Sequence, residues 1–416
     1  MKKYLIEGGK KLSGKVEIES AKNSILALLA GSILTDEEVV IKNCPKINDV
    51  LSMIDILSFL GVKCSFNENS LIINAKERKG FCVPENLTKK LRSSTYLMGA
   101  LLASQGLSKI FFPGGCNIGE RPIDIHIDAF KRLGVSVNVE KSFVECKRNN
   151  VSGGRVIFSF PSFGATVNVI LYSVIGRGKT IIHNCAKEPE IVDLSNFLNS
   201  MGAKIKGAGT GRIEIDGVNK LHGIEYKPIA DRIEVGTFLL SCAITGGDIE
   251  IHNANLQNIQ LLTHKISNTS CKIDIKNDII YANYCGVRES FNVETGPFPA
   301  FPTDMQPQTL AYLTVCKGNS FVKEKLFEKR FTQVDDLKKM GADLLVVDNC
   351  AFVRGVDKLK GCEVNANDLR GGASLVLASL FADGESLING VEHVERGYLN
   401  FDKKLLHLGA RIKTLG

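Results

Sequence analysis

Two kinds of helical pattern alternate along this chain. In the first kind, apolar residues recur every three to four positions, as at Val50, Ile54 and Leu57. This spacing predicts an amphipathic helix with one buried face. In the second kind, apolar and small residues fill every position, as in the run 25–32, Ile-Leu-Ala-Leu-Leu-Ala-Gly-Ser. Because such a helix has no polar face, it is expected to be buried on all sides.

A short signature recurs at the ends of the amphipathic patterns. It reads Leu or Met, then Gly, then Val or Ala, and Thr269-Ser270-Cys271 fills the one gap in the series. Successive copies lie about 70 residues apart, which indicates six copies of one structural unit. Each glycine is expected at the left-handed position that ends a helix. The glycines are Gly61, Gly134, Gly202, Gly341 and Gly409.

Each unit is predicted to read strand, buried helix, strand, amphipathic helix, strand. Short β-branched or apolar runs end at Asn or Gly, as in 39–43, 180–184, 248–253 and 387–390, which is typical of strands that end in a turn. The alternation of strands and helices predicts an α/β fold. The six buried helices are expected at 22–34, 92–104, 164–176, 232–246, 304–318 and 370–384.

Charged and polar residues stand at the first turns of these buried helices. Burying them fully is costly, so these helix ends must reach solvent or be paired. Helix N-termini that stand beside basic residues favour anions such as phosphate or carboxylate. The alternative is that Asp231, Thr303 and Asp368 are ordinary N-caps and the arginines are solvated or salt-bridged. The residues concerned are Lys22-Asn23, Arg92, Ser162-Phe163-Gly164, Asp231-Arg232, Thr303-Asp304 and Asp368-Leu369-Arg370, and the entrances of the amphipathic helices add Arg121, Glu188, Arg330 and Arg396.

One loop carries a candidate reactive thiol. Residues 111–126 pass from a strand end through Pro113-Gly114-Gly115 to Cys116 and Arg121, and Pro122 is expected to open the next helix. A permanent cation nearby favours the thiolate and makes a cysteine reactive. The alternative is a glycine-rich turn with an incidental cysteine.

Composition and charge narrow the class of protein. The chain has 416 residues, 44% of them hydrophobic and 23% charged, which is ordinary for a globular protein and long for one core, so two domains are expected. The start has no signal-peptide core and no run approaches a membrane span, which predicts a cytoplasmic protein without a membrane partner. The formal charge is +7, but no basic cluster is interleaved with aromatic residues. Small anionic substrates are therefore favoured over nucleic acid.

Cysteine spacing argues against a metal site. The twelve cysteines are scattered singly, with no Cys-x-x-Cys pair and no His-Glu-x-x-His motif. Most lie in apolar stretches, as Cys242 and Cys316 do. They are expected to be small buried residues in a reducing compartment, with Cys116 as the exception.

Five motifs together carry a family resemblance. They are Ser20-Ala21-Lys22-Asn23, the Gly114-Gly115-Cys116 loop with 121–126, Phe301-Pro302-Thr303-Asp304-Met305-Gln306, Asp368-Leu369-Arg370 and Glu395-Arg396-Gly397-Tyr398. In this order they resemble the UDP-N-acetylglucosamine 1-carboxyvinyltransferases, which are enolpyruvyl transferases. The resemblance implies transfer of enolpyruvyl from phosphoenolpyruvate to the 3-hydroxyl of UDP-N-acetylglucosamine, the first committed step of peptidoglycan synthesis. These two small molecules would be the substrates; neither a cofactor nor an oligomer is implied.

The resemblance also implies an architecture. It predicts a two-domain inside-out α/β barrel, with three units per domain, helices within, sheets outside, and the active site in the cleft between the domains. Residues 1–21 with 230–416 would form one domain. Residues 22–229, with the Cys116 loop, would form the other.

Catalytic and phosphoenolpyruvate-binding roles follow from the resemblance. Lys22, Arg121 and Arg396 would hold the phosphate, with Asn23 beside them, and two further arginines would face the carboxylate. Asp304 is the candidate general base for the sugar hydroxyl. Cys116 is the candidate acid toward C3 or an aid to product release. The carboxylate pair is Arg330 and Arg370.

The sugar nucleotide would be bound by a second set of residues. For two of them, Asp124 and His126, the alternative is an ordinary pair on a solvated helix turn. The implied UDP-N-acetylglucosamine contacts are Asn23, Arg92, Arg121, Pro122, Asp124, Ile125, His126, Ser162, Phe163, Gly164, Asp304 and Phe327.

Departures from the family pattern and competing functions complete the expectations. Ser20 stands where a glycine usually precedes Ala-Lys-Asn, and Lys329, where Asn usually stands, adds charge near the expected phosphoenolpyruvate site.

The nearest rival function is a 3-phosphoshikimate 1-carboxyvinyltransferase. A catalytically silent paralogue that binds the UDP-sugar is a second rival, although Lys22, Asp304 and the arginines are all present. A nucleic-acid-binding protein would need an aromatic platform, which the sequence lacks.

Overall fold

The structure is a computed structural model that describes residues 2–114, 119, 122–149, 153–277 and 279–416. The described residues form two compact units. Unit 1 consists of residues 2–19 and 230–416 with Gly119, and unit 2 consists of residues 20–114 and 122–229. The domain boundaries expected from the sequence stay a prediction. The loop residues Cys116 and Arg121 lie outside the described residues.

Unit 2 contains three four-stranded sheets, ordered β14-β3-β5-β4, β6-β7-β9-β8 and β10-β11-β13-β12. In each sheet the first pair is parallel and the remaining pairs are antiparallel, as in β10 with β11 and β11 with β13. The strands are β3 Val39–Ile41, β4 Lys63–Asn67, β5 Ser70–Asn74, β6 Cys82–Val83, β7 Leu107–Phe111, β8 Val135–Val139, β9 Phe143–Arg148, β10 Gly153–Ile157, β11 Lys179–His183, β12 Lys204–Lys206, β13 Arg212–Asp216 and β14 Glu225–Tyr226.

Unit 1 repeats this arrangement in the sheets β16-β17-β15-β2, β18-β19-β21-β20 and β22-β23-β1-β24. The chain start supplies a strand to two of these sheets, since β2 pairs with β15 and β1 lies between β23 and β24. The strands are β1 Lys3–Glu7, β2 Ser13–Glu17, β15 Asp248–His252, β16 Cys271–Lys276, β17 Ile279–Tyr284, β18 Val293–Glu294, β19 Asn319–Lys323, β20 Asp343–Val347, β21 Cys350–Arg354, β22 Glu363–Asn365, β23 Glu385–Asn389 and β24 Arg411–Leu415.

The six helices without a polar face form the cores, as predicted. Every residue of α8 from Arg232 to Ile244 is buried. Within unit 1, α8, α10 and α12 contact one another, and within unit 2, α1, α4 and α6 do the same. Two of the six begin with a 3₁₀ turn. Their bounds are α1 Lys22–Ser32, η1 Arg92–Tyr96 with α4 Leu97–Gln105, α6 Phe163–Ser173, α8 Arg232–Thr245, η3 Thr303–Met305 with α10 Gln306–Leu313, and α12 Leu369–Phe381.

Amphipathic helices and short turns complete each unit. The amphipathic helices are α2 Asn48–Phe59, α5 Asp124–Arg132, α7 Pro189–Ser200, α9 Gln260–Thr269, α11 Val334–Lys339 and α13 Phe401–His407. The short helices are α3 Glu85–Thr88, η2 Leu256–Ile259 and η4 Val391–Arg396. Helix α5 begins at Asp124, so the expectation that Pro122 opens it is wrong by two residues.

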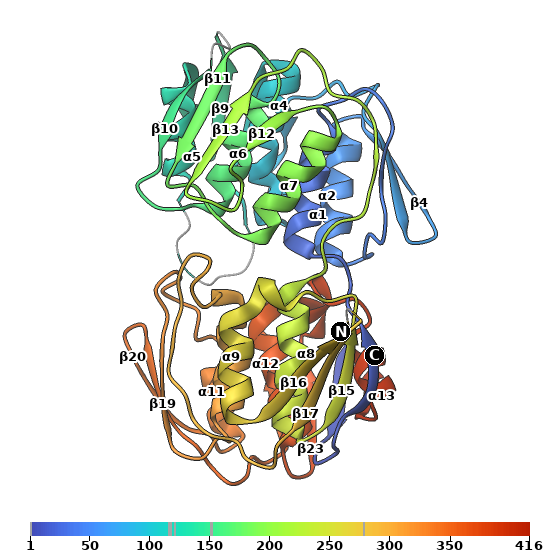
Figure 1. Ribbon diagram of the computed structural model, residues 1–416, viewed down its shortest axis with the longest axis vertical. Coiled ribbons are helices and arrows are strands. Elements are labelled where there is room, and N and C mark those ends of the chain that lie inside the picture. The colour runs from blue at the N-terminus through green and yellow to red at the C-terminus, as the bar shows by residue number, and fades with distance from the viewer. Residues whose placement is uncertain (1, 115–118, 120–121, 150–152, 278) are drawn as a thin grey trace. The chain divides into compact units, whose positions relative to one another are not determined.

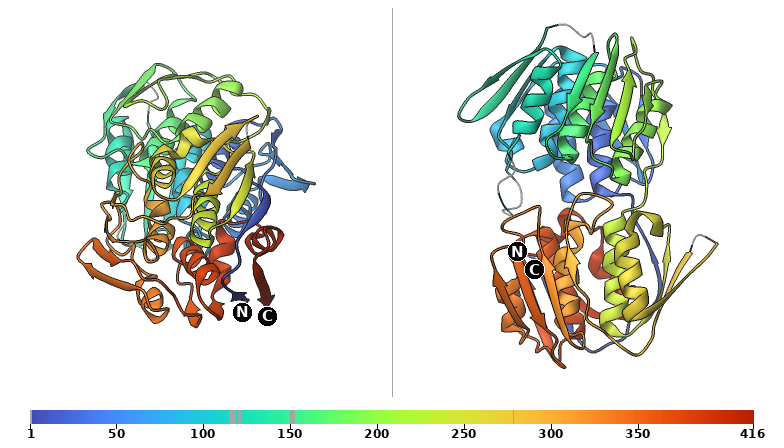
Figure 2. Two further views of the ribbon diagram at one scale, coloured as in Figure 1. Left: turned by 60° about the horizontal axis from the view of Figure 1, so that its bottom comes forward. Right: turned by 60° about the vertical axis from the view of Figure 1, so that its left-hand side comes forward.

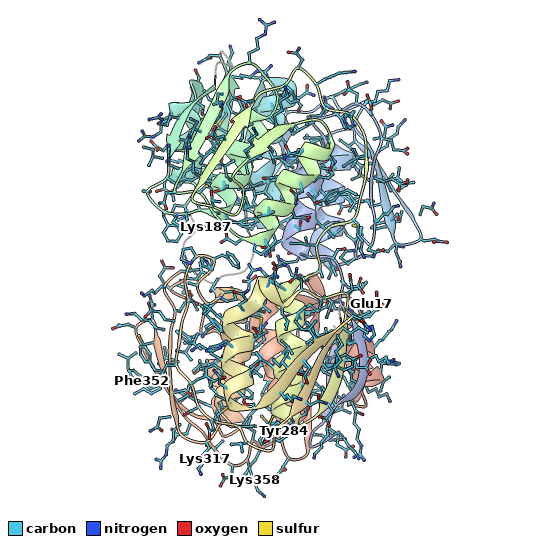
Figure 3. The ribbon with its side chains drawn as sticks, in the orientation of Figure 1. Glu17, Lys187, Tyr284, Lys317, Phe352 and Lys358 are labelled. Carbon is cyan, nitrogen blue, oxygen red and sulfur yellow. The ribbon has the colours of Figure 1, made fainter. Side chains whose placement is uncertain are left out.

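The sheets lie outside the helices. In unit 1, α8 and α12 lie between β19 and β20 on one side and β15 to β17 on the other, and the second view agrees (Figures 1 and 2). The Phe352 side chain is 50% exposed and projects from the outer side of its sheet (Figure 3). Its ring lies 5.4 Å from that of Phe321 on β19. The predicted α/β fold of six repeats with buried helices is therefore confirmed.

Each repeat has one strand more than the sequence pattern predicted. In five repeats the chain forms a hairpin of two strands after the amphipathic helix, as in β4 with β5 and β20 with β21, and in the sixth β24 pairs instead with β1 at the chain start. The hairpin turns use non-glycine residues in the left-handed region, such as Glu68 at φ 51° and Asp348 at φ 52°. These two turns contain no glycine, so no local signal marks where one strand ends and the next begins, whereas the turn between β12 and β13 contains Gly207 and Gly209 at positive φ.

The helix-ending glycines adopt the predicted backbone conformation. Gly61, Gly134 and Gly202 have φ of 84°, 78° and 100°, and Gly341 and Gly409 follow the same rule. In the fourth repeat, Ser270 instead has an extended φ of −152°, and its hydroxyl bonds to the Tyr312 hydroxyl. Helix α9 therefore ends without a left-handed residue, because a residue with a side chain is strained in that conformation.

Replacement of Gly134 by alanine tests the left-handed requirement alone. An added Cβ at Gly134 would meet no atom within 4 Å, so Gly134→Ala should cost only backbone strain, about 1 kcal/mol of unfolding free energy. Gly211→Ala, at a glycine of unit 2 without a positive φ, is the matched control and should be neutral or slightly stabilising. Urea denaturation of both variants measures the difference. Equal losses would contradict the assignment.

Candidate active site

Two buried guanidinium groups of unit 1 share one carboxylate. Arg330 Nη2 donates to Asp304 Oδ1 at 2.8 Å, and Arg370 Nη2 donates to Asp304 Oδ2 at 3.1 Å. The arginine side chains are only 4% and 3% exposed, whereas the Asp304 side chain is 28% exposed. The structure thus brings together three predicted site residues that are up to 66 positions apart in sequence.

Each member of this cluster is held by its own element. Arg370 stands in the first turn of α12, where the Asp368 side chain caps the helix by accepting from the Arg370 and Gly371 backbone N–H groups. Asp304 lies in the 3₁₀ turn η3 that precedes α10. Arg330 lies at the end of a loop that comes just before α11. The side chains therefore converge because three helix starts of the repeat lie in one unit.

Glu324 fixes the loop that carries Arg330. Its buried carboxylate accepts from the backbone N–H groups of Leu326 and Phe327 at 2.7 and 3.2 Å. It also accepts from the hydroxyls of Thr295 and Thr303 at 2.8 and 2.9 Å. One carboxylate thereby joins the Arg330 loop to the residue next to Asp304, and this role was not foreseen from the sequence.

Electrostatics keep Arg370 charged in spite of its burial. Burial by itself lowers the pKa of Arg370, but Tyr398 and the carboxylates of Asp304 and Asp231 raise it by more. The pKa therefore lies above its usual value. A permanently charged, buried fork with one partly exposed partner is suited to a planar carboxylate ligand.

Phe327 and Arg396 are the other predicted site residues of unit 1. Phe327 packs against Arg330, a member of the Asp304, Arg330 and Arg370 cluster. The Arg330 guanidinium is 5.8 Å from the centre of the Phe327 ring. Arg396 ends η4 and is half-buried. Lys329, the departure from the family pattern, is exposed.

In unit 2, Lys22 pairs with an acidic residue that the sequence analysis missed. Lys22 Nζ lies 3.1 Å from Asp49 Oδ2, and the two side chains are 12% and 6% exposed. Asp49 stands in the first turn of α2 and is buried. A charged residue on the buried face of an amphipathic helix was the signal that could have revealed it. Asn23, next to Lys22, is half-buried.

His126 is a buried, neutral residue in the structure. Asn168 Oδ1 accepts from the Gly99 backbone N–H at 2.7 Å, so its amide nitrogen faces His126 and donates to Nδ1 at 2.8 Å. Nδ1 is therefore the unprotonated ring nitrogen. Burial, with a smaller effect of the Arg92 charge, lowers the pKa of His126 to about 3. The alternative of a solvated pair with Asp124 is wrong, because Asp124 is exposed while His126 is buried.

Other predicted residues of unit 2 stand at the starts of α5 and α6, and one of them, Gly164, lies against His126. A Cβ on Gly164 would lie 3.0 Å from His126 Cε1, so the missing side chain permits this close approach. The Phe163 ring lies 6.1 Å from that of Tyr96. The Ser162 hydroxyl caps α6 by accepting from the Ala165 N–H at 3.3 Å. Pro122 and Ile125, at the start of α5, are exposed and half-buried respectively.

Two of the three residues that could be ordinary N-caps, Asp231 and Asp368, do cap helices. Asp231 accepts from the Ile233 and Glu234 backbone N–H groups, and Asp368 caps α12 in the same way. Thr303 does not cap a helix, because its hydroxyl donates to Glu324. Arg330 and Arg370 are buried ion-pair residues, so the alternative that they are salt-bridged holds and the alternative that they are solvated is wrong.

Most of the described cysteines are buried, as predicted, but Cys285 is exposed, which the prediction did not include. All of those described are free, and Cys242 and Cys316 are fully buried. Burial raises the pKa of Cys316 to about 12, which makes its thiol unreactive. Cys116 and Arg121 lie outside the described residues.

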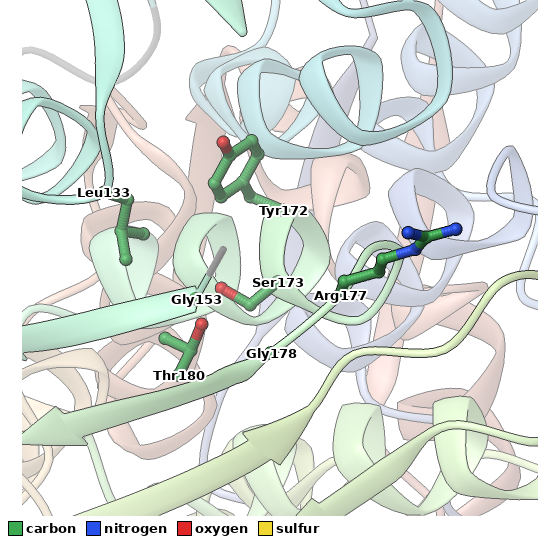
Figure 4. A pocket seen from close by; sticks show the side chains of 7 residues that line it. All are labelled: Leu133, Gly153, Tyr172, Ser173, Arg177, Gly178 and Thr180. Atoms are coloured by element: carbon green, nitrogen blue, oxygen red, sulfur yellow. The ribbon is translucent and has the colours of Figure 1, made fainter. Parts of the chain in front are cut away.

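A small pocket of unit 2 lies away from these residues. It is lined by Leu133, Tyr172, Ser173, Arg177 and Thr180, among others. The Ser173 hydroxyl points toward it, whereas the Arg177 guanidinium points away (Figure 4). Among the described lining residues no charged group points inward, so they offer no binding group for the anionic substrates expected here. Among the described residues, no helix is both long and apolar enough to cross a bilayer.

Comparison with known proteins covers the whole chain. The sequence profile described as EPSP synthase (3-phosphoshikimate 1-carboxyvinyltransferase) matches residues 6–405. UDP-N-acetylglucosamine 1-carboxyvinyltransferase 2 of Caldanaerobacter subterraneus is 45% identical over 414 residues, which is 99% of each chain. UDP-N-acetylglucosamine 1-carboxyvinyltransferase 1 of Clostridium perfringens is 42% identical over the full length of both chains.

Solved structures share the fold at lower identity. The enolpyruvyl transferase NikO from Streptomyces tendae superposes with a TM-score of 0.88 at 22% identity, over 99% of this chain and 98% of that one. An EPSP synthase from Acinetobacter baumannii superposes with a TM-score of 0.75 at 17% identity, over 100% of both chains. These similarities confirm the predicted two-domain α/β fold.

Acidification should destabilise unit 2 through His126. Its pKa is about 3 in the folded protein and about 6.5 when unfolded, so the unfolded state binds the extra proton between these values. Stability is therefore lost as the pH falls below 6.5, by about 2 kcal/mol between pH 7 and pH 5. His126→Gln, which cannot titrate, should lose about that much less over the same interval. Urea denaturation of both proteins at the two pH values measures this, and equal losses would refute it.

Proposed function

The chain belongs to the EPSP synthase family of enolpyruvyl transferases, and we propose that it transfers the enolpyruvyl group of phosphoenolpyruvate to the 3-hydroxyl of UDP-N-acetylglucosamine. The observation that carries the proposal is the buried Arg330–Asp304–Arg370 bridge, which combines a carboxylate-binding fork with a candidate base. Relatives of equal length and 42–45% identity carry the name of this activity. The product would serve peptidoglycan synthesis in the cytoplasm.

The reaction is an addition followed by an elimination. The sugar oxygen bonds to C2 of phosphoenolpyruvate while its proton leaves to a base, and C3 gains a proton from an acid. The resulting tetrahedral ketal then loses the proton at C3, and the C2–O bond to phosphate breaks. Inorganic phosphate and the enolpyruvyl ether are the products, so the reaction requires only proton transfer and stabilisation of anionic charge.

We assign the anionic groups of phosphoenolpyruvate to cationic residues of both units. Arg330 and Arg370 would face the carboxylate, because their forks are already bound to a carboxylate, that of Asp304. Lys22, Arg121 and Arg396 would hold the phosphate, with Asn23 beside it. The exposed Lys329 adds one more positive charge to this loop.

Proton transfer is assigned to Asp304 and Cys116. Asp304 would accept the proton of the sugar hydroxyl once the substrate carboxylate has replaced it on the arginines. Its 28% exposure makes it accessible to an incoming substrate. Cys116 would donate to C3 or assist product release.

The sugar nucleotide would be bound mainly by unit 2. The buried His126 and the half-buried Phe163 and Gly164 form a preorganised surface next to Arg92, which is suited to a base and a diphosphate. We keep the two domains as residues 1–21 with 230–416 and residues 22–229. The other residues assigned to this substrate are Asn23, Arg121, Pro122, Asp124, Ile125, Ser162, Asp304 and Phe327.

Acceptor specificity decides between this function and its nearest rival. Phosphate release from phosphoenolpyruvate should require UDP-N-acetylglucosamine and should not occur with 3-phosphoshikimate or without acceptor. Release with 3-phosphoshikimate would instead support the rival function, which shares the description of the matched profile. No release with either acceptor would leave a silent paralogue as the better account.

Asp304→Asn tests the base. The amide keeps the shape of the carboxylate but cannot accept a proton, so kcat should fall by a factor on the order of 10²–10⁴. Asp343→Asn is the matched control, because Asp343 lies on the exposed edge strand β20. Phosphate release by the two purified variants provides the measurement. Full activity in Asp304→Asn would rule out this role.

Arg330→Lys tests the carboxylate fork. A lysine keeps the charge but cannot donate two parallel hydrogen bonds, so the KM for phosphoenolpyruvate should rise roughly 10- to 100-fold. The KM for the sugar nucleotide should change little. Arg354→Lys, at an exposed position of β21, is the control. Equal effects on both substrates would contradict the assignment to the carboxylate.

A further inference from the structure

A buried hydrogen-bond network lies directly behind Arg370. Arg370 Nη1 donates to the Tyr398 hydroxyl at 3.0 Å. The same hydroxyl lies 2.8 Å from Thr237 Oγ1 and accepts from Gln308 Nε2 at 3.0 Å. Thr237, Gln308 and Arg370 belong to the three core helices α8, α10 and α12 of unit 1. Tyr398 therefore joins all three helices at one point.

The direction of each hydrogen bond in this network is determined. Thr237 Oγ1 donates to the backbone carbonyl of Ile233 at 2.8 Å, so it accepts from the Tyr398 hydroxyl. The Arg370 guanidinium and the Gln308 amide nitrogen can only donate, so the Tyr398 oxygen accepts from both. The Tyr398 hydroxyl thus makes three hydrogen bonds of fixed direction. The Tyr398 ring stacks on the Phe401 ring, with 4.8 Å between the ring centres. Such a group has no freedom to rotate away.

The two partners of Arg370 differ in their access to solvent. Asp304, on Nη2, has a side chain that is 28% exposed. Tyr398, on Nη1, is 1% exposed. A substrate anion that enters from solvent can replace Asp304 but cannot reach Tyr398. One side of the guanidinium is thus exchangeable and the other is permanent.

We propose that Tyr398 is a positioning residue that holds the Arg370 guanidinium in place while the substrate carboxylate exchanges with Asp304. The inference rests on the proposed function and deepens it. Without the tyrosine anchor, Arg370 would follow Asp304 or rotate when that bond is broken. With the anchor, the arginine keeps its fork at the carboxylate position, and Asp304 is released for its role as a base. Tyr398 acts through Arg370 and does not touch the substrate.

Tyr398→Phe is the direct test. It removes the hydroxyl and keeps the ring on Phe401, so the KM for phosphoenolpyruvate should rise roughly 10- to 100-fold. The KM for UDP-N-acetylglucosamine should stay within about twofold. Tyr312→Phe is the matched control, because Tyr312 is a buried tyrosine of the same unit whose hydroxyl bonds to Ser270. It should leave both KM values unchanged.

A double variant separates positioning from general stability. If Tyr398 acts through Arg370, adding Tyr398→Phe to Arg370→Lys should raise the KM for phosphoenolpyruvate by much less than it does alone. Multiplicative effects would overturn the proposal, as would an unchanged KM in active Tyr398→Phe. Failure of the proposed function is recognised separately, because the unaltered protein would then release no phosphate.

A second pair of variants applies if Tyr398→Phe does not fold. Thr237→Val removes the acceptor that orients the Tyr398 hydroxyl, whereas Thr237→Ser keeps it. The KM for phosphoenolpyruvate should be several-fold higher in the valine variant than in the unaltered protein. In the serine variant it should equal that of the unaltered protein. The same value in both variants would also overturn the proposal.

Discussion

Burial of helices that have no polar face is the constraint on which this structure depends. Such helices are stable only when neighbours cover every side, and α8, α10 and α12 of unit 1 cover one another while the sheets cover the rest. Polar residues can then reach solvent only where a helix begins. Chemistry is consequently confined to the first turns and the loops that precede them, which is where Lys22, Asp304 and Arg370 stand.

The cost of placing charge at these positions explains the second layer of the site. Arg330 and Arg370 are almost fully buried and need partners, which Asp304 and Tyr398 supply. Lys22 similarly has Asp49, and burial keeps His126 neutral while Asn168 donates to its Nδ1. The supporting residues are polar side chains on buried faces. Asn168, Thr237 and Gln308 are buried polar side chains within three of the core helices.

Much of the fold was predictable because its signals are local and occur six times. The left-handed glycines and the apolar helices could be recognised in any one repeat and confirmed in the others. The hairpin that follows five of the amphipathic helices was not predicted, and turns such as those at Glu68 and Asp348 contain no glycine to mark it. Partners such as Glu324 and Asp49 were also missed, because hydrogen bonds between distant segments leave no periodic signal in a sequence.

The sequence by itself determined the six repeats, which helices must be buried, and which residue types stand at their first turns, because these depend on spacing along one chain. Tertiary structure decided which of those residues meet. It joined Arg330 and Arg370 through Asp304, gave Tyr398 three partners, and made His126 a buried neutral side chain. These outcomes depend on distances between helices that are far apart in sequence, and such distances are set only when the helices pack.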